Sequence, residues 1–268
     1  MKKIQNIVVG IDFSVTARGA YRYAKSLAQT LGATLTVVHV KENNSGENEL
    51  AKDLEQLIAE ENNGTAPLDV VRIKVLTGNT VEVLTGLPEN TGTDLLVLGS
   101  TGLSDVLTGI FGATSLKISN QAHCPVLLVP RGTKWQPVRQ VLFASDYDSM
   151  TSQSVKRISD LAADFNAGIH FVNVRNYDPI LEPKQKDIDW DPLLTAHNFE
   201  LPCHKATVYG NDTVAELKKY SEANNIDLMA FTSRHRDFWG NLVHKSITGN
   251  MAMSANIPVL VMHADDEN

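Results

Sequence analysis

The chain of 268 residues contains the same residue pattern twice, from end to end. Each copy opens with an apolar run that closes on an aspartate, Ile7–Asp12 in the first and Val141–Asp146 in the second. Later apolar runs recur in the same order about 133 positions further on; they are residues 34–40 and 169–174, 94–98 and 227–231, and 125–129 and 258–262. Matches that keep their order and spacing are typical of internal duplication. The sequence therefore predicts two tandem domains of one fold.

Apolar runs alternate with helical patterns in both copies. Apolar or small residues spaced at i, i+4, i+7 and i+8 form one buried helical face. In the first copy these are Ala20, Ala24, Leu27, Ala28 and Leu31, matched in the second by Ser154, Ile158, Leu161, Ala162 and Phe165. We expect Ser14 or Thr16 to cap the first of these helices and Gly32 to end it, with Asn166 and Gly168 serving the second. Strands that are apolar throughout and alternate with helices indicate a parallel sheet covered on both faces, so each copy is predicted to be a doubly wound α/β domain.

The segment Arg131–Pro137 is polar and contains helix breakers, which indicates a connection between domains. We therefore predict domains at residues 1–132 and 138–268. The copies differ most between their second and third strands. Residues 47–62 have the pattern of an acidic amphipathic helix, whereas residues 178–202 contain four prolines and are predicted to be rich in loops.

Composition excludes several classes of protein. A net charge of −7 and a pI near 5.6 disfavour binding to nucleic acid or to an anionic membrane, which needs a summed positive field. No apolar run approaches the roughly 18 residues needed to span a bilayer. The two cysteines, Cys124 and Cys203, lie in different copies, which argues against a disulfide framework and against a zinc site. A cytoplasmic location is the default prediction.

One loop of the first copy has the composition of a phosphate site. Gly99-Ser100-Thr101-Gly102 follows the fourth strand, and after nine residues Gly112-Ala113-Thr114-Ser115 opens a helix. Glycines let a phosphate approach the backbone closely, and free amides and hydroxyls at a helix N-terminus suit an anion. Asp12 ends the first strand at the same carboxyl edge, where ligands of open α/β sheets bind. The pattern is neither a Walker loop nor the Rossmann fingerprint.

The order of these motifs resembles the universal stress protein family, and the likeness covers essentially the whole of each half. It rests on Asp12, His39-Val40, Gly78, Asp94, the glycines Gly99, Gly102 and Gly112, and Pro125-Val126. The resemblance implies a five-stranded sheet of order 3-2-1-4-5 and ATP as ligand, with any metal arriving as Mg²⁺ on the nucleotide. It also implies that Asp12 contacts ribose or phosphate, that the backbone around Val40 meets adenine, and that the three glycines make room for phosphates.

The first copy departs from the family at one position. Ala113 stands where relatives usually carry serine or threonine, which removes a phosphate hydrogen bond worth on the order of 1 kcal/mol unless Thr114 and Ser115 compensate.

The second copy keeps Asp146 but loses the glycines. Thr232, His235 and Lys245 stand in their places, so side chains occupy the space that phosphates need. The prediction is a structural copy without nucleotide. A rival interpretation is that the run Arg234-His235-Arg236 binds an anion through side-chain charge.

The function predicted is that of a cytoplasmic stress-response protein, which binds ATP in its N-terminal domain and uses the C-terminal copy as a structural or regulatory partner. Asp12 and Asp146 have no accompanying base or nucleophile, and His39 is interpreted as a satisfied core residue, so an enzyme is disfavoured. Two alternatives stay open: a nucleotide-independent interaction scaffold, and a slow ATPase or adenylyl-transferring enzyme.

The apolar fifth strands, residues 125–129 and 258–262, suggest that the two domains pair as a pseudo-dimer within the chain, and a homodimer stays open.

Overall fold

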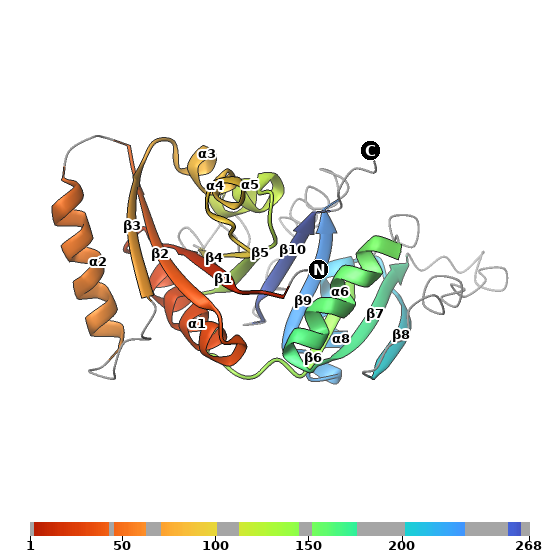
Figure 1. The fold of residues 1–268 in the computed structure, drawn as a ribbon. Coiled ribbons are helices and arrows are strands. Elements are labelled where there is room, and N and C mark those ends of the chain that lie inside the picture. The colour runs from red at the N-terminus through yellow and green to blue at the C-terminus, as the bar shows by residue number, and fades with distance from the viewer. Residues whose placement is uncertain are drawn as a thin grey trace, which may run out of the picture. The chain divides into compact units, whose positions relative to one another are not determined.

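Five parallel strands form the sheet of the N-terminal unit, in the order β3-β2-β1-β4-β5 (Figure 1). In chain order the strands are β1 (Asn6–Gly10), β2 (Thr34–Lys41), β3 (Val71–Thr77), β4 (Leu95–Ser100) and β5 (Val126–Pro130). This computed structural model describes residues 3–42, 46–62, 71–100, 113–144, 152–175, 202–233 and 257–263. It divides into two compact units, Lys2–Trp135 and Gln136–Asn268.

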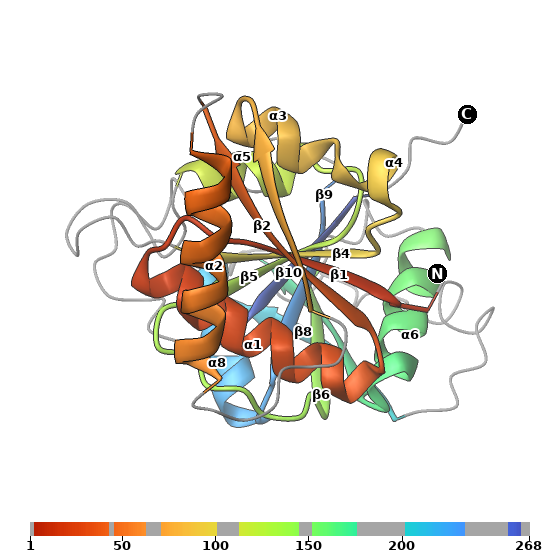
Figure 2. The same cartoon turned by 60° about the vertical axis from the view of Figure 1, so that its left-hand side comes forward.

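Helices cover both faces of this first sheet. α1 (Val15–Leu31) and α2 (Glu47–Glu61) contact each other on one face, while α3 (Thr80–Thr85) and α5 (Ala113–Gln121) contact each other on the opposite face (Figure 2). A short helix, α4 (Leu87–Thr91), follows α3. β4 and β5 are almost completely buried between the two helical layers, which explains why their sequences are mostly apolar.

The first helix forms as its sequence predicts. The Ser14 hydroxyl caps it by accepting a hydrogen bond from the backbone N–H of Ala17 at 3.1 Å. Gly32 ends it in the left-handed region at φ 65°, which favours glycine. The whole predicted face is buried, namely Ala20, Ala24, Leu27, Ala28 and Leu31. The acidic amphipathic helix predicted at residues 47–62 is also confirmed as α2, which buries Leu54, Leu57 and Ile58.

The C-terminal unit repeats the strand order of the first as β8-β7-β6-β9-β10, again all parallel. Its strands are β6 (Gln140–Ala144), β7 (Gly168–Arg175), β8 (Cys203–Tyr209), β9 (Leu228–Ser233) and β10 (Val259–His263). α6 (Ser152–Phe165) and α8 (Thr213–Ala223) lie on opposite faces of this sheet (Figures 1 and 2). The predicted fold class is thereby confirmed.

An equivalent aspartate in each unit holds the start of the central strand by hydrogen bonds. Asp94 precedes β4, and its Oδ2 accepts the backbone N–H groups of Gln5 and Asn6, both at 2.9 Å. In the second unit Asp227 Oδ2 accepts the N–H groups of Arg139 and Gln140 at 2.8 and 3.0 Å. Each carboxylate therefore joins the start of the fourth strand of its unit to the start of the first. We call these two arrangements the aspartate clamps.

Neighbouring residues of the connection belong to different units. Trp135 packs edge-on against Tyr23 of α1, with ring centroids 4.9 Å apart. The next residue, Gln136, donates from its side-chain amide to Asp227 Oδ1 at 2.9 Å. The change from one unit to the other thus takes place at the peptide bond between these two residues.

A buried histidine in the second unit has hydrogen-bond partners on both ring nitrogens. His170 of β7 stacks on His204 of β8 with centroids 4.5 Å apart, and its ring nitrogens bond Tyr220 Oη at 3.0 Å and Gln140 Oε1 at 3.1 Å. Because the amide oxygen can only accept, Nε2 carries the hydrogen and Nδ1 accepts from the tyrosine hydroxyl. Burial, and then the neighbouring His204, lower the pKa of His170 below its ordinary value.

We expect acidification below about pH 6.5 to destabilise the second unit through His170. The unfolded chain takes up a proton near the ordinary pKa of 6.5 while the folded ring resists it, so the free energy of unfolding falls as the pH drops through this window. Urea unfolding at pH 7.5 and pH 5.5 should show a smaller loss of stability in His170→Gln than in the wild type. An equal loss in both proteins would contradict this role.

Candidate functional site

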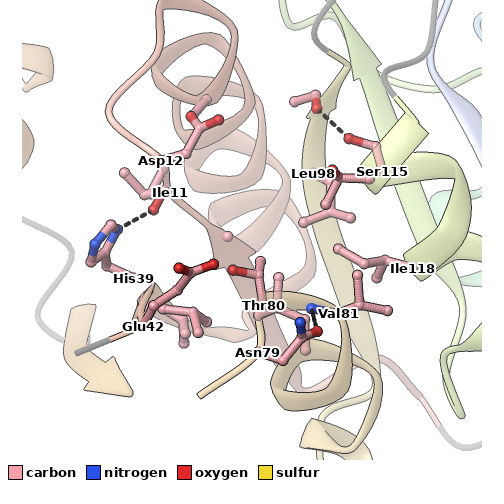
Figure 3. Close-up of a pocket in the computed structure, with 17 residues that line it drawn as sticks. Ile11, Asp12, His39, Glu42, Asn79, Thr80, Val81, Leu98, Ser115 and Ile118 are labelled. Carbon is pink, nitrogen blue, oxygen red and sulfur yellow. Dashed lines mark hydrogen bonds between the residues drawn. The ribbon is translucent and has the colours of Figure 1, made fainter. Parts of the chain in front are cut away.

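A cavity of about 410 Å³ lies at the carboxyl edge of the first sheet (Figure 3). Its walls come from the ends of β1, β2 and β4 and from the first turns of α3 and α5. Residues at these five places line it: Gly10, Ile11, Asp12, Val38, His39, Val40, Glu42, Leu98 and Gly99 from the strand ends, and Asn79, Thr80, Val81, Thr114 and Ser115 from the helix starts. The strand ends and helix starts of a doubly wound sheet meet at this edge, which is where such folds bind ligands.

The turn after β1 holds Asp12 at the cavity. The Asp12 side chain is exposed, and its Oδ1 accepts the backbone N–H of Ser14 at 3.0 Å. Phe13 has a φ of 63°, in the left-handed region that phenylalanine rarely adopts. Its ring packs against His39 with centroids 4.9 Å apart. The turn is thus fixed both by a hydrogen bond of the carboxylate and by a ring contact with the neighbouring strand.

His39 corrects one prediction. Its Nδ1 donates to the carbonyl oxygen of Ile11 at 2.7 Å, so the expectation of a satisfied nitrogen is right. The expectation of a core position is wrong, because the ring is only partly buried and lines the cavity. The strand end extends to the ligand edge of the sheet, where an inward-facing side chain reaches the cavity instead of the core. His39 therefore supports the backbone immediately before Asp12.

Gly99 is required by the packing of the strand against a helix. A Cβ at this position would lie 2.7 Å from the carbonyl carbon and oxygen of Thr16 and 2.9 Å from the amide nitrogen of Ala17. The end of β4 therefore approaches the backbone of the first turn of α1 more closely than any side chain permits. Gly99 lines the cavity as predicted from the motif, but the space that its missing side chain leaves is filled by α1.

The two hydroxyls at the start of α5 have different surroundings. Ser115 is buried, and its Oγ donates to the carbonyl oxygen of Gly99 at 3.1 Å. Its hydrogen is thus engaged within the protein, and towards a ligand this hydroxyl can only accept. Thr114 is exposed at the cavity wall. Of the two residues expected to compensate for Ala113, which opens the helix, only Thr114 is placed to donate.

The cavity brings together five of the eight predicted site residues: Asp12, Val40, Gly99, Thr114 and Ser115. Ala113 begins α5, next to the lining residues. Gly102 and Gly112 lie outside the described residues, as do Asp146, Arg234, His235, Arg236 and Lys245 of the second copy.

Glu42 and Asn79 are among the polar lining residues that the sequence motifs do not predict. Asn79 caps α3, because its Oδ1 accepts the N–H groups of Val81 and Glu82 at 3.0 and 3.3 Å. Glu42 directly follows β2. In the sequence, this position at the carboxyl end of a strand is the only indication that it could be a site residue.

The described lining of the cavity is acidic. It holds two carboxylates, Asp12 and Glu42, and neither lysine nor arginine. The described residues also contain no cluster of three histidine, cysteine or carboxylate side chains able to hold a metal ion. The positive end of α5, about half an elementary charge, is therefore the main attraction that the described walls offer to an anion.

Among the described residues, no helix is long and apolar enough to cross a membrane.

Comparisons with known proteins agree on one family over both halves. The profile of the universal stress protein family matches residues 3–130 and again residues 137–263. The universal stress protein Slr1230 of Synechocystis sp. (strain ATCC 27184 / PCC 6803 / Kazusa) is 26% identical, over 96% of this chain and 99% of its own.

Solved structures that match almost the whole chain have the same fold. A universal stress protein from Archaeoglobus fulgidus DSM 4304 superimposes with a TM-score of 0.71 at 14% identity, covering 98% of this chain and 99% of its own. A putative universal stress protein from Pseudomonas aeruginosa UCBPP-PA14 gives a TM-score of 0.59 at 14% identity, with 98% and 94% covered.

Proposed function

The chain belongs to the universal stress protein family, and from this we propose that its N-terminal domain binds ATP in the cavity at the carboxyl edge of the first sheet. The observation that carries the proposal is the meeting of Asp12, Val40, Gly99 and Thr114 around one cavity, although they come from four separate segments of the chain. Its volume of about 410 Å³ falls in the range of small-molecule sites, roughly 300–1,000 Å³.

The charges of the cavity support one orientation of the nucleotide. The N-terminus of α5, with the exposed Thr114 hydroxyl, favours the phosphates. The carboxylates of Asp12 and Glu42 repel phosphates and accept hydrogen bonds from hydroxyl or amino groups, so the nucleoside lies on their side. We propose that Asp12 accepts from the ribose hydroxyls and that the backbone at Val40 meets the adenine.

Mg²⁺ fits this proposal as a companion of the ligand. An acidic cavity without a described lysine or arginine leaves most of the triphosphate charge to be neutralised by a bound cation. The chain's own contribution is to position the nucleotide through the α5 N-terminus and the Asp12 turn. We expect weaker binding of ATP when Mg²⁺ is removed with a chelator.

The second domain is proposed to be a structural or regulatory partner without nucleotide. Thr232 stands at the position of Gly99 and is buried at the corresponding place in β9. It thus carries the side chain that the first domain excludes. Domain boundaries at 1–132 and 138–268, pairing of the domains through their fifth strands, a cytoplasmic location and a role in the stress response stay proposals of the same kind.

Titration calorimetry with ATP and Mg²⁺ tests the proposed function. We expect one site per chain, and Thr114→Val should weaken binding about fivefold because one hydrogen bond of about 1 kcal/mol is lost. Thr213→Val makes the same change in the first turn of a helix in the other domain and should leave the affinity unchanged. If the wild type binds no adenine nucleotide, the proposal is wrong and an interaction scaffold becomes the better reading of the fold.

A further inference from the structure

We propose that Glu42 selects adenine against purines with a keto group at position 6, which makes it a specificity-determining residue. The inference rests on the proposed nucleotide site and adds to it the chemical group by which the base is recognised.

The backbone places Glu42 in the cavity wall. β2 pairs with β3 up to Lys41, which lies opposite Thr77, and the carbonyl oxygen of Lys41 accepts the N–H of Gly78 at 2.9 Å. This last bond fixes the chain immediately before Glu42 next to the turn that starts α3. Figure 3 shows the Glu42 carboxylate directed towards Thr80, across the cavity from Ser115. Glu42 thus faces the part of the cavity that is remote from the start of α5.

The surroundings of Glu42 suit a flat base. Val40, two residues before Glu42, and Val81, next to Thr80, also line the cavity, and so does the buried side chain of Leu84. Apolar side chains of this kind pack against the faces of an aromatic ring, whereas a triphosphate gains nothing from them. The nucleoside end of the ligand therefore fits this side better than the phosphate end does.

The carboxylate is available to a ligand. Glu42 is exposed, and it makes no hydrogen bond or ion pair with another described residue. An ionised carboxylate accepts hydrogen bonds and donates none. The group of the base that faces it must therefore be a donor.

Adenine and hypoxanthine differ in the group at position 6. Adenine presents an amino group, which donates to the carboxylate. Hypoxanthine and guanine present a carbonyl oxygen, which places an acceptor against an acceptor. The keto analogue therefore loses the hydrogen bond to the carboxylate and brings a partly negative oxygen towards a negative charge, so it should bind more weakly.

The test compares ATP with inosine triphosphate, which carries the keto group in place of the amino group. We expect the wild type to bind ATP at least roughly tenfold more tightly, the effect of one hydrogen bond to a charged group. In Glu42→Gln the ratio should fall to within about twofold, because an amide can donate to a carbonyl as well as accept from an amino group. Glu55→Gln removes the same charge from an exposed position of α2 outside the cavity and should keep the wild-type ratio.

The two proposals fail in different ways. If the wild type binds ATP and Glu42→Gln leaves the ratio unchanged, Glu42 does not read the base and the proposed function stands. If the wild type binds neither nucleotide, both proposals are overturned. Glu42 is exposed, so its variant should melt at the wild-type temperature, and a lower melting temperature would argue for a structural role instead.

Discussion

Replacing Gly99 with alanine is expected to lower the free energy of unfolding of the N-terminal domain by about 2–3 kcal/mol. The new Cβ would lie 2.7 Å from two backbone atoms of Thr16. If the contacted atoms belonged to a flexible side chain, that side chain could move away. They belong to the backbone of a capped helix, which cannot. Either β4 or the first turn of α1 must move, and both carry cavity residues. Urea unfolding followed by circular dichroism measures the loss.

Gly19→Ala is the matched control for this substitution. Gly19 lies inside α1, and a Cβ there would meet only the end of the Arg22 side chain, at 3.8 Å. Alanine has the higher helix propensity, so this variant should be more stable than the wild type by up to about 1 kcal/mol. If Gly99→Ala is as stable as Gly19→Ala, the close approach of β4 and α1 does not exist in solution.

Removing an aspartate clamp is the second change with a large expected effect. Asp94→Ala should cost the N-terminal domain about 2–3 kcal/mol, because the backbone N–H groups of Gln5 and Asn6 both lose a charged acceptor. Asp227→Ala should cost the C-terminal domain a similar amount. The estimate stays below the sum of two full charged bonds, since Gln5 is exposed and water can replace its partner.

Asparagine variants separate charge from geometry in this experiment. Asp94→Asn keeps an oxygen that can accept from the same two N–H groups, so it should retain part of the stability that alanine loses. Differential scanning calorimetry should follow each variant. Equal melting of Asp94→Ala and the wild type would show that the clamp contributes nothing to the fold.

Much of the fold can be predicted from the sequence because its signals are local or repeated. The cap at Ser14 and the buried face of α1 depend on residues within one helix, and the strands repeat in both halves. The end of α1 at Gly32 needs only a positive φ, which glycine provides. These features depend on residues that are close together in the sequence, so prediction and structure agree.

The candidate site is less predictable because its contacts cross long stretches of sequence. Ser115 was expected to offer a hydroxyl to phosphate, but the hydroxyl donates to Gly99, sixteen residues earlier. No spacing rule reports such a bond. His39 has the sequence context of a core residue, but it lies near the end of β2, opposite Val75 of β3, and there it lines the cavity. Glu42 was missed because an exposed glutamate after a strand is among the commonest surface residues.

The division of contacts between Trp135 and Gln136 has a consequence for the genetics of the chain. Each of these residues is attached to its own half, and neither aspartate clamp crosses the bond between them. A gene split at this codon boundary would give two polypeptides. Each would contain all five strands of one sheet and the aspartate that holds its central strand. The duplication can therefore be undone at one peptide bond, which makes this the natural place to join, exchange or separately label the halves.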